Sequence, residues 1–306
     1  MNPAYSPGRV ARLPALVALL GLVVASRAAQ QGPSLPPPLP SGPDAVRFAV
    51  IGDSGTGRKA QYEVAARLAD YHRHYPFDFV IMLGDNMYGS QRPEDFVKKF
   101  ERPYAPLLEA GVKFYAALGN HDNPPEVNYK PFNMDGRNYY TFTKGSAQFF
   151  VLDSNYMDPK QLAWVEQELK ASNKRWKIAY FHHPLYSSGK RHGSETDLRA
   201  LLEPLLVQHG VDVVFAGHEH FYERVKPQKG IAYFTQGGSA KLRRGNIRQT
   251  ALTEKGFDTD RSFMVVAIDE NGLHFQAISR TGTLVDSGIV LGREALAGAA
   301  PSSTIR

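Results

Sequence analysis

Short apolar runs alternate with amphipathic segments along most of the 306-residue chain. The apolar runs are rich in Val, Ile, Phe and Ala, which predicts buried strands, and the segments between them carry hydrophobic residues at helical spacing. Strands are therefore expected at residues 46–51, 77–83, 112–118, 176–181 and 211–216. Helices are expected at residues 60–75, 159–172 and 195–209, and at 93–109 with interruptions at Pro103 and Pro106.

The remaining segments predict a different kind of strand pairing. Residues 137–143 and 148–153 have short β-like patterns on either side of Lys144-Gly145-Ser146, which predicts an antiparallel hairpin. The chain from residue 231 to about 290 is rich in strands, including residues 264–268, 273–278 and 284–290. Alternating strands and helices followed by further strands predict one α/β domain, with mixed β-structure arranged as two sheets stacked between helices.

The two ends of the chain differ from this domain in composition. Arg9 and Arg12 precede the apolar stretch 13–24, and small residues follow it, which is typical of a secretory signal peptide over residues 1–29. The stretch is shorter than the roughly 20 residues needed to span a bilayer, so a secreted or periplasmic protein without a stable membrane anchor is expected. The rest divides into a Pro-rich linker, a folded domain and a disordered tail, at residues 30–44, 45–292 and 293–306.

Charge and cysteine content exclude several classes of protein. The net charge is +6 and falls to +3 once Arg9, Arg12 and Arg27 leave with the signal peptide, which is too mild to indicate nucleic-acid binding. The chain has no cysteine, so disulfides, thiolate metal sites and lipidated cysteines are excluded. Nothing in the composition indicates an obligate protein partner.

Five short polar motifs each follow one of the predicted strands. Ligands of open α/β sheets bind beyond the carboxyl ends of the strands, which is where these motifs fall. Their carboxylates, phenol, carboxamide and imidazoles are the ligand set that two adjacent hard or borderline metal ions need. The motifs are Gly52-Asp53-Ser54-Gly55, Gly84-Asp85-Asn86-Met87-Tyr88, Gly119-Asn120-His121-Asp122, Phe181-His182-His183-Pro184 and Gly217-His218-Glu219-His220.

Each motif taken alone also has a structural explanation. An Asp or Asn after a strand commonly caps the next helix or orders a turn, which would account for Asp53, Asp85 and Asn120. His218 and His220 reach one cavity together only if their segment is locally extended. Five complementary motifs at successive strand ends are harder to explain in this way, and the set favours a shared metal site.

The ordered set of motifs resembles the calcineurin-like metallophosphoesterases and, more narrowly, the purple acid phosphatases. The resemblance covers residues 46 to about 240, and the continuation of the last motif to Arg224 strengthens it. It implies a four-layer αββα sandwich around a dinuclear metal site. Most metallophosphoesterases carry a metal-binding His where this chain has Gly55, whereas Tyr88 stands where purple acid phosphatases place a tyrosinate ligand. Because a phenolate is a hard, anionic donor, the resemblance implies Fe(III) at this position.

Carried over residue by residue, the resemblance implies two metal ions, Fe(III) and a divalent ion such as Fe, Zn or Mn. It implies hydrolysis of small phosphate monoesters by a hydroxide formed between the metals. His121 and His192 would contact the substrate, bind phosphate oxygens and protonate the leaving group. The implied ligands are Asp53, Tyr88 and His220 for the first ion, Asn120, His182 and His218 for the second, and Asp85 as the bridge.

Other functions share parts of this pattern. A phosphodiesterase or nucleotide phosphatase would use the same scaffold, and a catalytically silent metal-binding protein would have no need of His121 and His192. Gly55-Thr56-Gly57 after a strand also suits a dinucleotide site with Asp85 as the ribose partner, as in an oxidoreductase, but this leaves the other motifs unexplained. A basic loop could attract anionic substrates, although a solvated charge run is the simpler interpretation of Lys241, Arg243, Arg244 and Arg248.

Overall fold

The computed structural model describes residues 1, 36–40 and 42–293. The chain divides into two units, residues 1–32 and 33–306, and the fold below is that of the second unit. Residues 2–29 of the expected signal peptide and residues 294–306 of the expected tail lie outside the described residues. Among the described residues, none of the helices is both long enough and apolar enough to span a membrane.

The first sheet has six strands in the order β13-β12-β11-β1-β2-β3. β1, β2 and β3 run parallel, and β11, β12 and β13 extend the sheet with antiparallel pairs. The parallel part is therefore built from the beginning of the domain and the antiparallel part from its end. The strands are β1 (Val46–Ile51), β2 (Phe79–Met82), β3 (Lys113–Ala116), β11 (Ser262–Ile268), β12 (Leu273–Ser279) and β13 (Leu284–Val290).

The second sheet has seven strands in the order β10-β8-β9-β7-β6-β5-β4. β5, β6, β7 and β9 are parallel, and antiparallel strands lie on both sides of them. The predicted hairpin is confirmed as the β4–β5 pair. The strands are β4 (Tyr140–Lys144), β5 (Ala147–Val151), β6 (Trp176–Phe181), β7 (Val213–Ala216), β8 (Tyr222–Gln228), β9 (Ile231–Gln236) and β10 (Thr253–Phe257).

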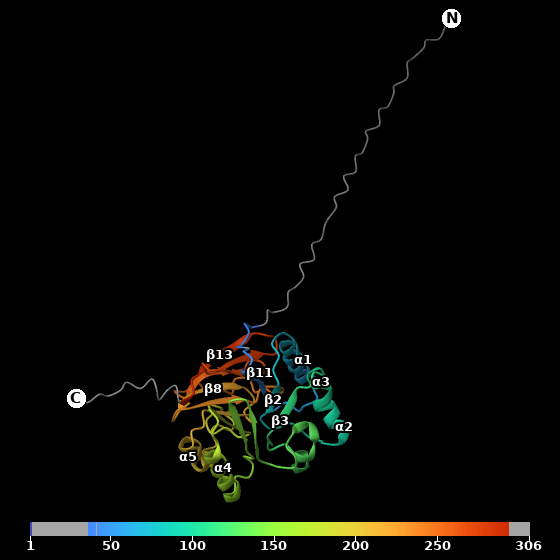
Figure 1. The fold of residues 1–306 in the computed structure, drawn as a ribbon. Coiled ribbons are helices and arrows are strands. Elements are labelled where there is room, and N and C mark those ends of the chain that lie inside the picture. The colour runs from blue at the N-terminus through green and yellow to red at the C-terminus, as the bar shows by residue number, and fades with distance from the viewer. Residues whose placement is uncertain (2–35, 41, 294–306) are drawn as a thin grey trace, which may run out of the picture. The chain divides into compact units, whose positions relative to one another are not determined.

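The helices form the two outer layers, as Figure 1 shows. One set covers the first sheet: α1 (Lys59–His74), α2 (Pro93–Phe96), a π-helical turn η1 (Val97–Glu101) and α3 (Arg102–Glu109). The other set, α4 (Pro159–Ala171) and α5 (Thr196–Gln208), covers the second sheet. Two short 3₁₀ turns, η2 (Pro124–Asn128) and η3 (Lys130–Phe132), follow β3. The predicted four-layer αββα sandwich is confirmed.

Interlocking aromatic rings hold the two sheets together. The Phe48 ring of β1 stacks on Phe79 of β2 with centroids 5.2 Å apart, and meets Phe149 and Phe215 of the second sheet edge-on at 5.3 and 6.2 Å. Burial of each such ring contributes on the order of 1.5–3 kcal/mol. Because side chains alternate along a strand, this packing sets the register of β1 and hence the place where Asp53 emerges beyond its end.

Three segments differ from the sequence-based expectation. The helix at 93–109 continues through Pro103 and Pro106, and its hydrogen-bond pattern changes earlier, at the π turn η1. Pro103 has no N–H to offer, and the carbonyls of the preceding turn are instead satisfied from α1: Gln61 donates to Lys99 O, and Tyr62 donates to Lys98 O at 2.7 Å. β8 was not expected, because it contains a proline, and β10, which is mostly polar, lies in the stretch from 231 to about 290 predicted to be rich in strands but was not predicted as an individual strand.

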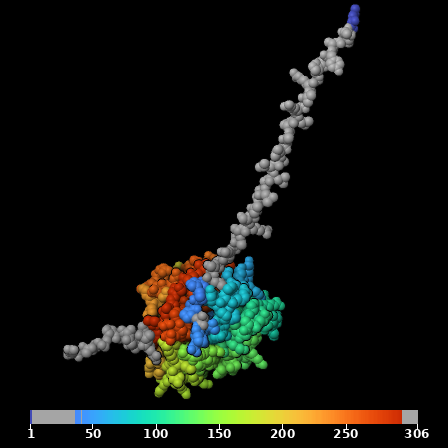
Figure 2. Space-filling model, turned by 45° about the horizontal axis from the view of Figure 1, so that its top comes forward, coloured from blue at the N-terminus to red at the C-terminus, as the bar shows by residue number. Residues whose placement is uncertain are grey.

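The described part of the expected linker contacts the domain. The Gln276 side-chain amide of β12 donates a hydrogen bond to Pro37 O at 2.7 Å, and Leu39 packs against the main core. A cavity of about 360 Å³ lies between this segment, α1 and β11. Figure 2 shows the segment on the surface between the C-terminal strands and α1. Residues 36–40 therefore lie along the outer face of the first sheet.

Candidate metal centre

All five motifs lie at the carboxyl ends of strands and meet where the two sheets face each other. Asp53, Asp85 and Asn120 follow β1, β2 and β3 of the first sheet, and His182 and His218 follow β6 and β7 of the second. Hydrogen bonds join the sheets here: His218 N donates to Asp53 Oδ2 at 2.8 Å, and His182 Nδ1 lies 2.9 Å from Leu83 O. The site is therefore built from both sheets at once.

The backbone of the site adopts a conformation that non-glycine residues rarely take. Asp53, Asp85 and His218 have positive φ angles of 54°, 52° and 67°. Left-handed conformations of this kind are costly outside glycine and collect at functional sites. Gly84, at φ 87°, shows the crowding, because a Cβ atom there would lie 2.6 Å from His182 Nδ1. The turns after β1, β2 and β7 thus bring these side chains together at the expense of local strain.

Gly55 has an explanation that does not involve a dinucleotide. A Cβ atom at this position would overlap the backbone carbonyl of Asn86, in the turn that follows β2. Gly55 N also donates to Asp85 O at 3.4 Å, and Tyr88 N donates to Gly55 O at 2.9 Å. The glycine therefore lets the first two motifs pack backbone to backbone, which accounts for it without a phosphate ligand.

The first ligand cluster combines two carboxylates, a phenol and an imidazole. Tyr88 donates its hydroxyl hydrogen to Asp53 Oδ1 at 2.9 Å, and His220 Nε2 lies 3.3 Å from the same hydroxyl and 3.2 Å from Asp53 Oδ1. One oxygen of Asp85 lies within 4.8 Å of the ligand atoms of Asp53 and His220. Asp53 and Asp85 are fully buried, and Tyr88 is half-buried. These are four of the seven residues that the sequence suggested as ligands.

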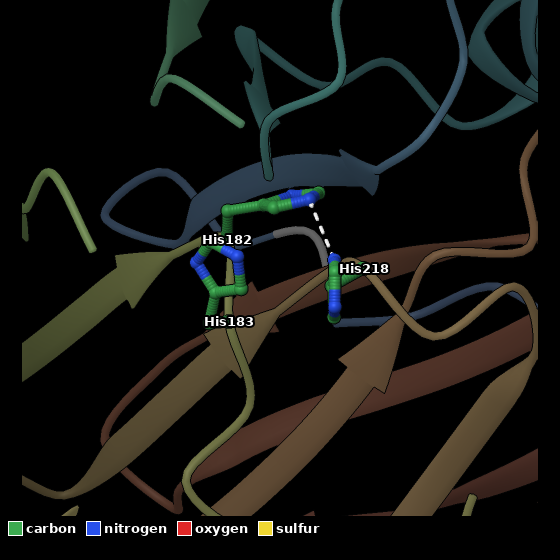
Figure 3. Close-up of side chains that lie close together, drawn as sticks. All are labelled: His182, His183 and His218. Atoms are coloured by element: carbon green, nitrogen blue, oxygen red, sulfur yellow. Dashed lines mark hydrogen bonds between the residues drawn. The ribbon is translucent and has the colours of Figure 1, made fainter. Parts of the chain in front are cut away.

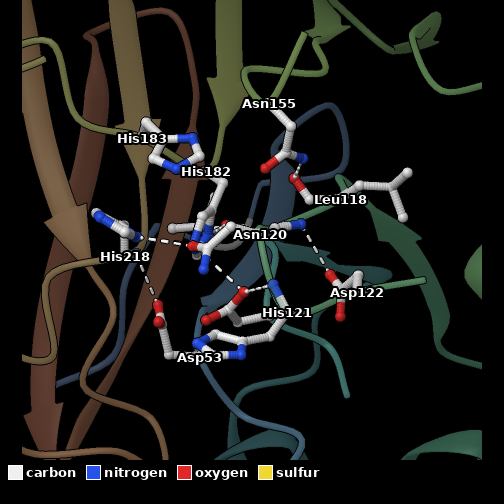
Figure 4. A network of polar contacts seen from close by, with 12 residues as sticks. Asp53, Leu118, Asn120, His121, Asp122, Asn155, His182, His183 and His218 are labelled. Carbon is white, nitrogen blue, oxygen red and sulfur yellow. Dashed lines mark hydrogen bonds and ion pairs between the residues drawn. The ribbon is translucent and has the colours of Figure 1, made fainter. Parts of the chain in front are cut away.

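The second cluster combines two imidazoles and a carboxamide. Asn120 Oδ1 lies 3.1 Å from His182 Nε2 and 3.0 Å from His218 Nδ1, and the two imidazole nitrogens are 3.2 Å apart. Figure 4 shows these three side chains pointing toward one another beside Asp53. Asp85 Oδ1 lies 3.4 Å from His182 Nε2, so Asp85 borders both clusters. All seven suggested ligands therefore lie in one site.

His183 adds a third imidazole next to the second cluster. Figure 3 shows its ring beside those of His182 and His218, and one ligand nitrogen of each lies within 4.8 Å of the others. Its Nδ1 is 2.9 Å from the Ser154 hydroxyl oxygen, which also accepts hydrogen bonds from the backbone N–H groups of His182 and His183. Ser154 thus orients the motif after β6, and sequence reasoning did not identify it.

The arrangement of the polar atoms favours a cation in the second cluster. His182 Nδ1 faces the Leu83 carbonyl, which can only accept, so Nδ1 carries a proton and Nε2 is the nitrogen turned toward the site. This Nε2 atom lies 3.1 Å from Asn120 Oδ1 and 3.2 Å from His218 Nδ1. Burial, followed by the charges of His182 and other histidines, holds the pKa of His218 far below its ordinary value. Two imidazole nitrogens and an amide oxygen that converge in this way fit a bound metal ion.

The electrostatics of the first cluster lead to the same conclusion. Burial raises the pKa of Asp53 well above its usual range, although His182 opposes this. Burial and the charges of Asp53 and Asp85 raise the pKa of Tyr88, so its phenolate does not form here without a cation to compensate it. Burial, with Arg243 and Lys241, lowers the pKa of His220 to about 3, which leaves a neutral imidazole. The donor set therefore fits a hard, highly charged ion.

Acidic groups beside the ligands hold the motif turns together. Asp122 accepts hydrogen bonds from Asn86 Nδ2, Met87 N and Gly119 N at 2.8–2.9 Å, and so ties the second motif to the third. Glu219 accepts from Gly193 N at 2.8 Å and Asn246 Nδ2 at 3.0 Å. Both residues lie inside the polar motifs, so the signal was in the sequence, but their supporting role was not recognised.

Lys99 is a buried lysine that supports the Tyr88 turn from outside the motifs. Its ammonium group donates hydrogen bonds to the carbonyls of Tyr88, at 2.9 Å, and Ser90, and lies 3.4 Å from Asp95. The side chain comes from the π turn η1, and such turns often occur at functional sites. A single lysine within a predicted helix carries no pattern that would distinguish it from a surface residue.

The two suggested substrate histidines stand exposed at the edge of the site. The His121 ring lies 4.8 Å from the Tyr88 ring between centroids, and its backbone N–H donates to Asp85 Oδ1 at 3.0 Å. The His192 ring lies 4.2 Å from that of His218. Burial and the neighbouring Arg243 and Arg191 lower the pKa of His192. Both rings therefore lie beside the two ligand clusters, from different loops.

Comparison with known proteins places this arrangement in a family. The calcineurin-like phosphoesterase family model matches residues 46–222, which is more than half of the chain. Purple acid phosphatase 17 of Arabidopsis thaliana is 29% identical over 69% of this chain and 73% of its own. The Fe(3+)-Zn(2+) purple acid phosphatase 12 of the same plant is 30% identical over 64% of this chain and 47% of its own.

A solved structure supports the fold independently. GAP50, described as the anchor in the inner membrane complex of Plasmodium, has a TM-score of 0.68 at 22% identity, over 81% of this chain and 89% of that one. At this level of identity the match concerns the fold alone. The family match, the purple acid phosphatase relatives and the shared fold agree with the motifs described above. The chain therefore belongs to the calcineurin-like phosphoesterase family, with purple acid phosphatases among its relatives.

Proposed function

We propose that this protein is a dinuclear metallophosphatase that hydrolyses phosphate monoesters. The observation that carries the proposal is the pair of adjoining ligand clusters, whose ligand atoms converge and which share Asp85 at their border. Purple acid phosphatases among the relatives support the reaction class, and the name of one of them includes Fe(3+) and Zn(2+). Tyr88 supports a trivalent ion, because a phenolate is a hard anionic ligand.

The contacts within each cluster support a division of these residues between the two ions. Asp53, Tyr88 and His220 would hold Fe(III), and Asp85 would bridge the ions. Asn120, His182 and His218 would hold a divalent ion such as Zn, Fe or Mn. Bound ions would supply an acidified water as the nucleophile and would neutralise charge on the phosphate. His183 is a further imidazole beside this ligand set, and its Nδ1 lies 2.9 Å from the Ser154 hydroxyl oxygen.

The exposed histidines act on the substrate directly. His121 and His192 flank the ligand clusters, where they would donate hydrogen bonds to the phosphate oxygens and orient the ester. One of them would donate a proton to the departing alkoxide oxygen, as a general acid worth typically about 10²–10⁴-fold in rate. A silent metal-binding protein would have no use for these two rings, so their position supports an enzyme.

Metal analysis together with one substitution tests this proposal. The purified protein is expected to hold two ions and to hydrolyse p-nitrophenyl phosphate. Asp85→Asn is expected to lose both ions, because this carboxylate borders both clusters. Asp70→Asn, on the outer helix α1, is the matched control and should keep both. Full metal content in Asp85→Asn, or a wild-type protein without metal or activity, would refute the assignment.

A phosphodiesterase is the second candidate on the same scaffold. The exposed rim at His121 and Asn120 leaves room for an ester with two organic groups. Relative rates on p-nitrophenyl phosphate and its bis ester separate the two activities. The proposed monoesterase should prefer the former, and a faster reaction of the bis ester would favour the diesterase.

We also infer that the protein is exported to the periplasm or secreted, on the basis of the N-terminal pattern of residues 1–29. Sequencing the N-terminus of the protein recovered from the producing cells tests this inference. A mature chain that begins near residue 30 supports export, and an intact N-terminus retained in the cytoplasm contradicts it.

A further inference from the structure

The cavity on the outer face of the first sheet is separate from the candidate metal centre. Its walls come from residues 38–40, from residues 71–77 at the end of α1, and from β1 and β11. Tyr71, Phe77 and Val265 are among the apolar residues that line it, and all three are buried. Its volume of about 360 Å³ lies within the range of about 300–1,000 Å³ that is typical of small-molecule sites.

Arg47 is a permanently charged residue in the wall of this cavity. Successive side chains of a strand point to opposite faces, and Phe48 packs against Phe149 of the second sheet, so Arg47 points to the outer face. The register of β1 with β11 places Arg47 opposite Ala267, which is fully buried. A guanidinium group therefore belongs to a wall that is otherwise largely apolar.

The charge of Arg47 has no acidic partner within the described part of the chain. Asp78 N donates to Arg47 O at 3.1 Å, but the side chains of these two residues form no ion pair. Arg47 Nε is buried and lacks a hydrogen-bond partner among the described residues. None of the described residues that line the cavity is acidic. Because an unpaired guanidinium donor in such surroundings is costly, a ligand that brings an anionic group to Arg47 would offset this cost.

One wall of the cavity is a separate segment of the chain, residues 36–40, which we call the N-terminal strap. Leu39 of the strap packs against the main core. The Gln276 side-chain amide donates to Pro37 O at 2.7 Å, and the Tyr71 hydroxyl donates to Gln276 Oε1 at 3.3 Å. Figure 2 shows the strap on the surface between α1 and the C-terminal strands. A molecule in the cavity would therefore contact the strap, the helix and the sheet at once.

We propose that this cavity binds a small amphipathic carboxylate, an aryl or alkyl acid whose carboxylate pairs with Arg47 and whose apolar body lies against Tyr71 and Phe77. A carboxylate matches a guanidinium both in charge and in its planar, two-point geometry. A neutral apolar molecule would leave Arg47 unpaired, and a highly polar anion would lose its hydration against the apolar wall without compensation. The site does not depend on the proposed function of the metal centre.

Calorimetric titration with 4-phenylbutyrate and with its neutral amide tests the role of the charge. The full-length protein is titrated in saturating inorganic phosphate, so that carboxylate binding to metal ions in the other site is blocked. The wild type should bind the acid about tenfold more tightly than the amide or better, since only the acid forms a charge-assisted pair. Arg47→Gln should lose this preference and keep its affinity for the amide. Arg73→Gln, at an exposed position in the last turn of α1, is the matched control and should keep the preference.

A second variant tests the location of the site independently of its charge. Leu39 lies in the strap, outside the helices and strands, so Leu39→Ala is expected to fold even if Arg47→Gln does not. The variant should bind both probes about threefold to tenfold more weakly, because it loses apolar contact area. Equal binding of the acid and the amide by the wild type, or no binding of either, overturns the proposal. An acid preference that survives Arg47→Gln, or that disappears when phosphate is added, overturns it as well.

Discussion

Replacing Lys99 by Met removes a buried ammonium that supports the Tyr88 turn. The Lys99 side chain is 8% exposed, and it donates to the carbonyls of Tyr88 and Ser90 and pairs with Asp95 at 3.4 Å. Met fills the volume of the lysine stem without strain but donates no hydrogen bond. The substitution therefore isolates the contribution of the charged group from that of its packing.

The expected loss of stability follows from the polar groups that lose Lys99 as a hydrogen-bond donor. Two carbonyls lose a charged donor, at about 1–3 kcal/mol for each buried acceptor left unsatisfied. Asp95 still accepts hydrogen bonds from the Ser90 hydroxyl at 2.6 Å and from Arg92 N at 3.1 Å, so its carboxylate is not left without donors. Together we expect Lys99→Met to lower the free energy of unfolding by about 3–5 kcal/mol. For a domain of this size, this corresponds to a Tm lower by roughly 6–20 °C.

Urea unfolding followed by circular dichroism measures this loss. Lys98→Met is the matched control, because Lys98 is the exposed neighbour on the same π turn. The control should unfold within about 0.5 kcal/mol of the wild type. If Lys99→Met and Lys98→Met unfold at the same urea concentration with the same slope, the ammonium does not hold the turn and the reasoning is wrong.

Three further predictions concern other parts of the molecule. Gly189→Ala should lower the free energy of unfolding by about 2–3 kcal/mol in the same assay, because its Cβ would overlap the buried carboxylate of Glu219; a neutral substitution would contradict the structure. Tyr88→Phe should abolish visible absorption from charge transfer between phenolate and iron, so a variant that keeps both its iron and the wild-type spectrum would remove Tyr88 from the site. Burial acts to raise the pKa of Glu203, but hydrogen bonds from Lys229 and two tyrosines outweigh it and the pKa is lowered. Its stabilisation is thus present above the unfolded-state pKa of about 4.3 and lost as the pH falls through the folded-state value. Stability of the wild type should consequently fall more steeply below about pH 4.5 than that of Glu203→Gln, and parallel curves would contradict this.

The sequence predicted most of the helices and strands because each of them has a characteristic hydrophobic pattern within its own residues. Apolar runs such as Val46–Ile51 and Trp176–Phe181 are buried on both faces, and a strand buried in this way leaves a continuous hydrophobic pattern. β8 escaped prediction, and β10 was covered only by the general expectation of strands from 231 to about 290, because the formation of both depends on pairing. β10 is a polar edge strand that pairs with β8, and β8 contains Pro227. Their backbone hydrogen bonds come from neighbours, not from their own composition.

The candidate site likewise has some features that the sequence predicts locally and others that depend on contacts between distant segments. The sequence by itself determined which polar side chains follow the strands, and the resemblance of the motifs suggested seven of them as ligands. Only the tertiary structure decided that two sheets meet there, that Lys99 and Glu219 hold the turns, and that Lys241 lies over Tyr88. A motif is a property of adjacent residues, whereas contacts such as Lys241 with Tyr88 join segments far apart in the chain. Such contacts exist only after the sheets have packed, because packing is what brings distant side chains within a few ångströms.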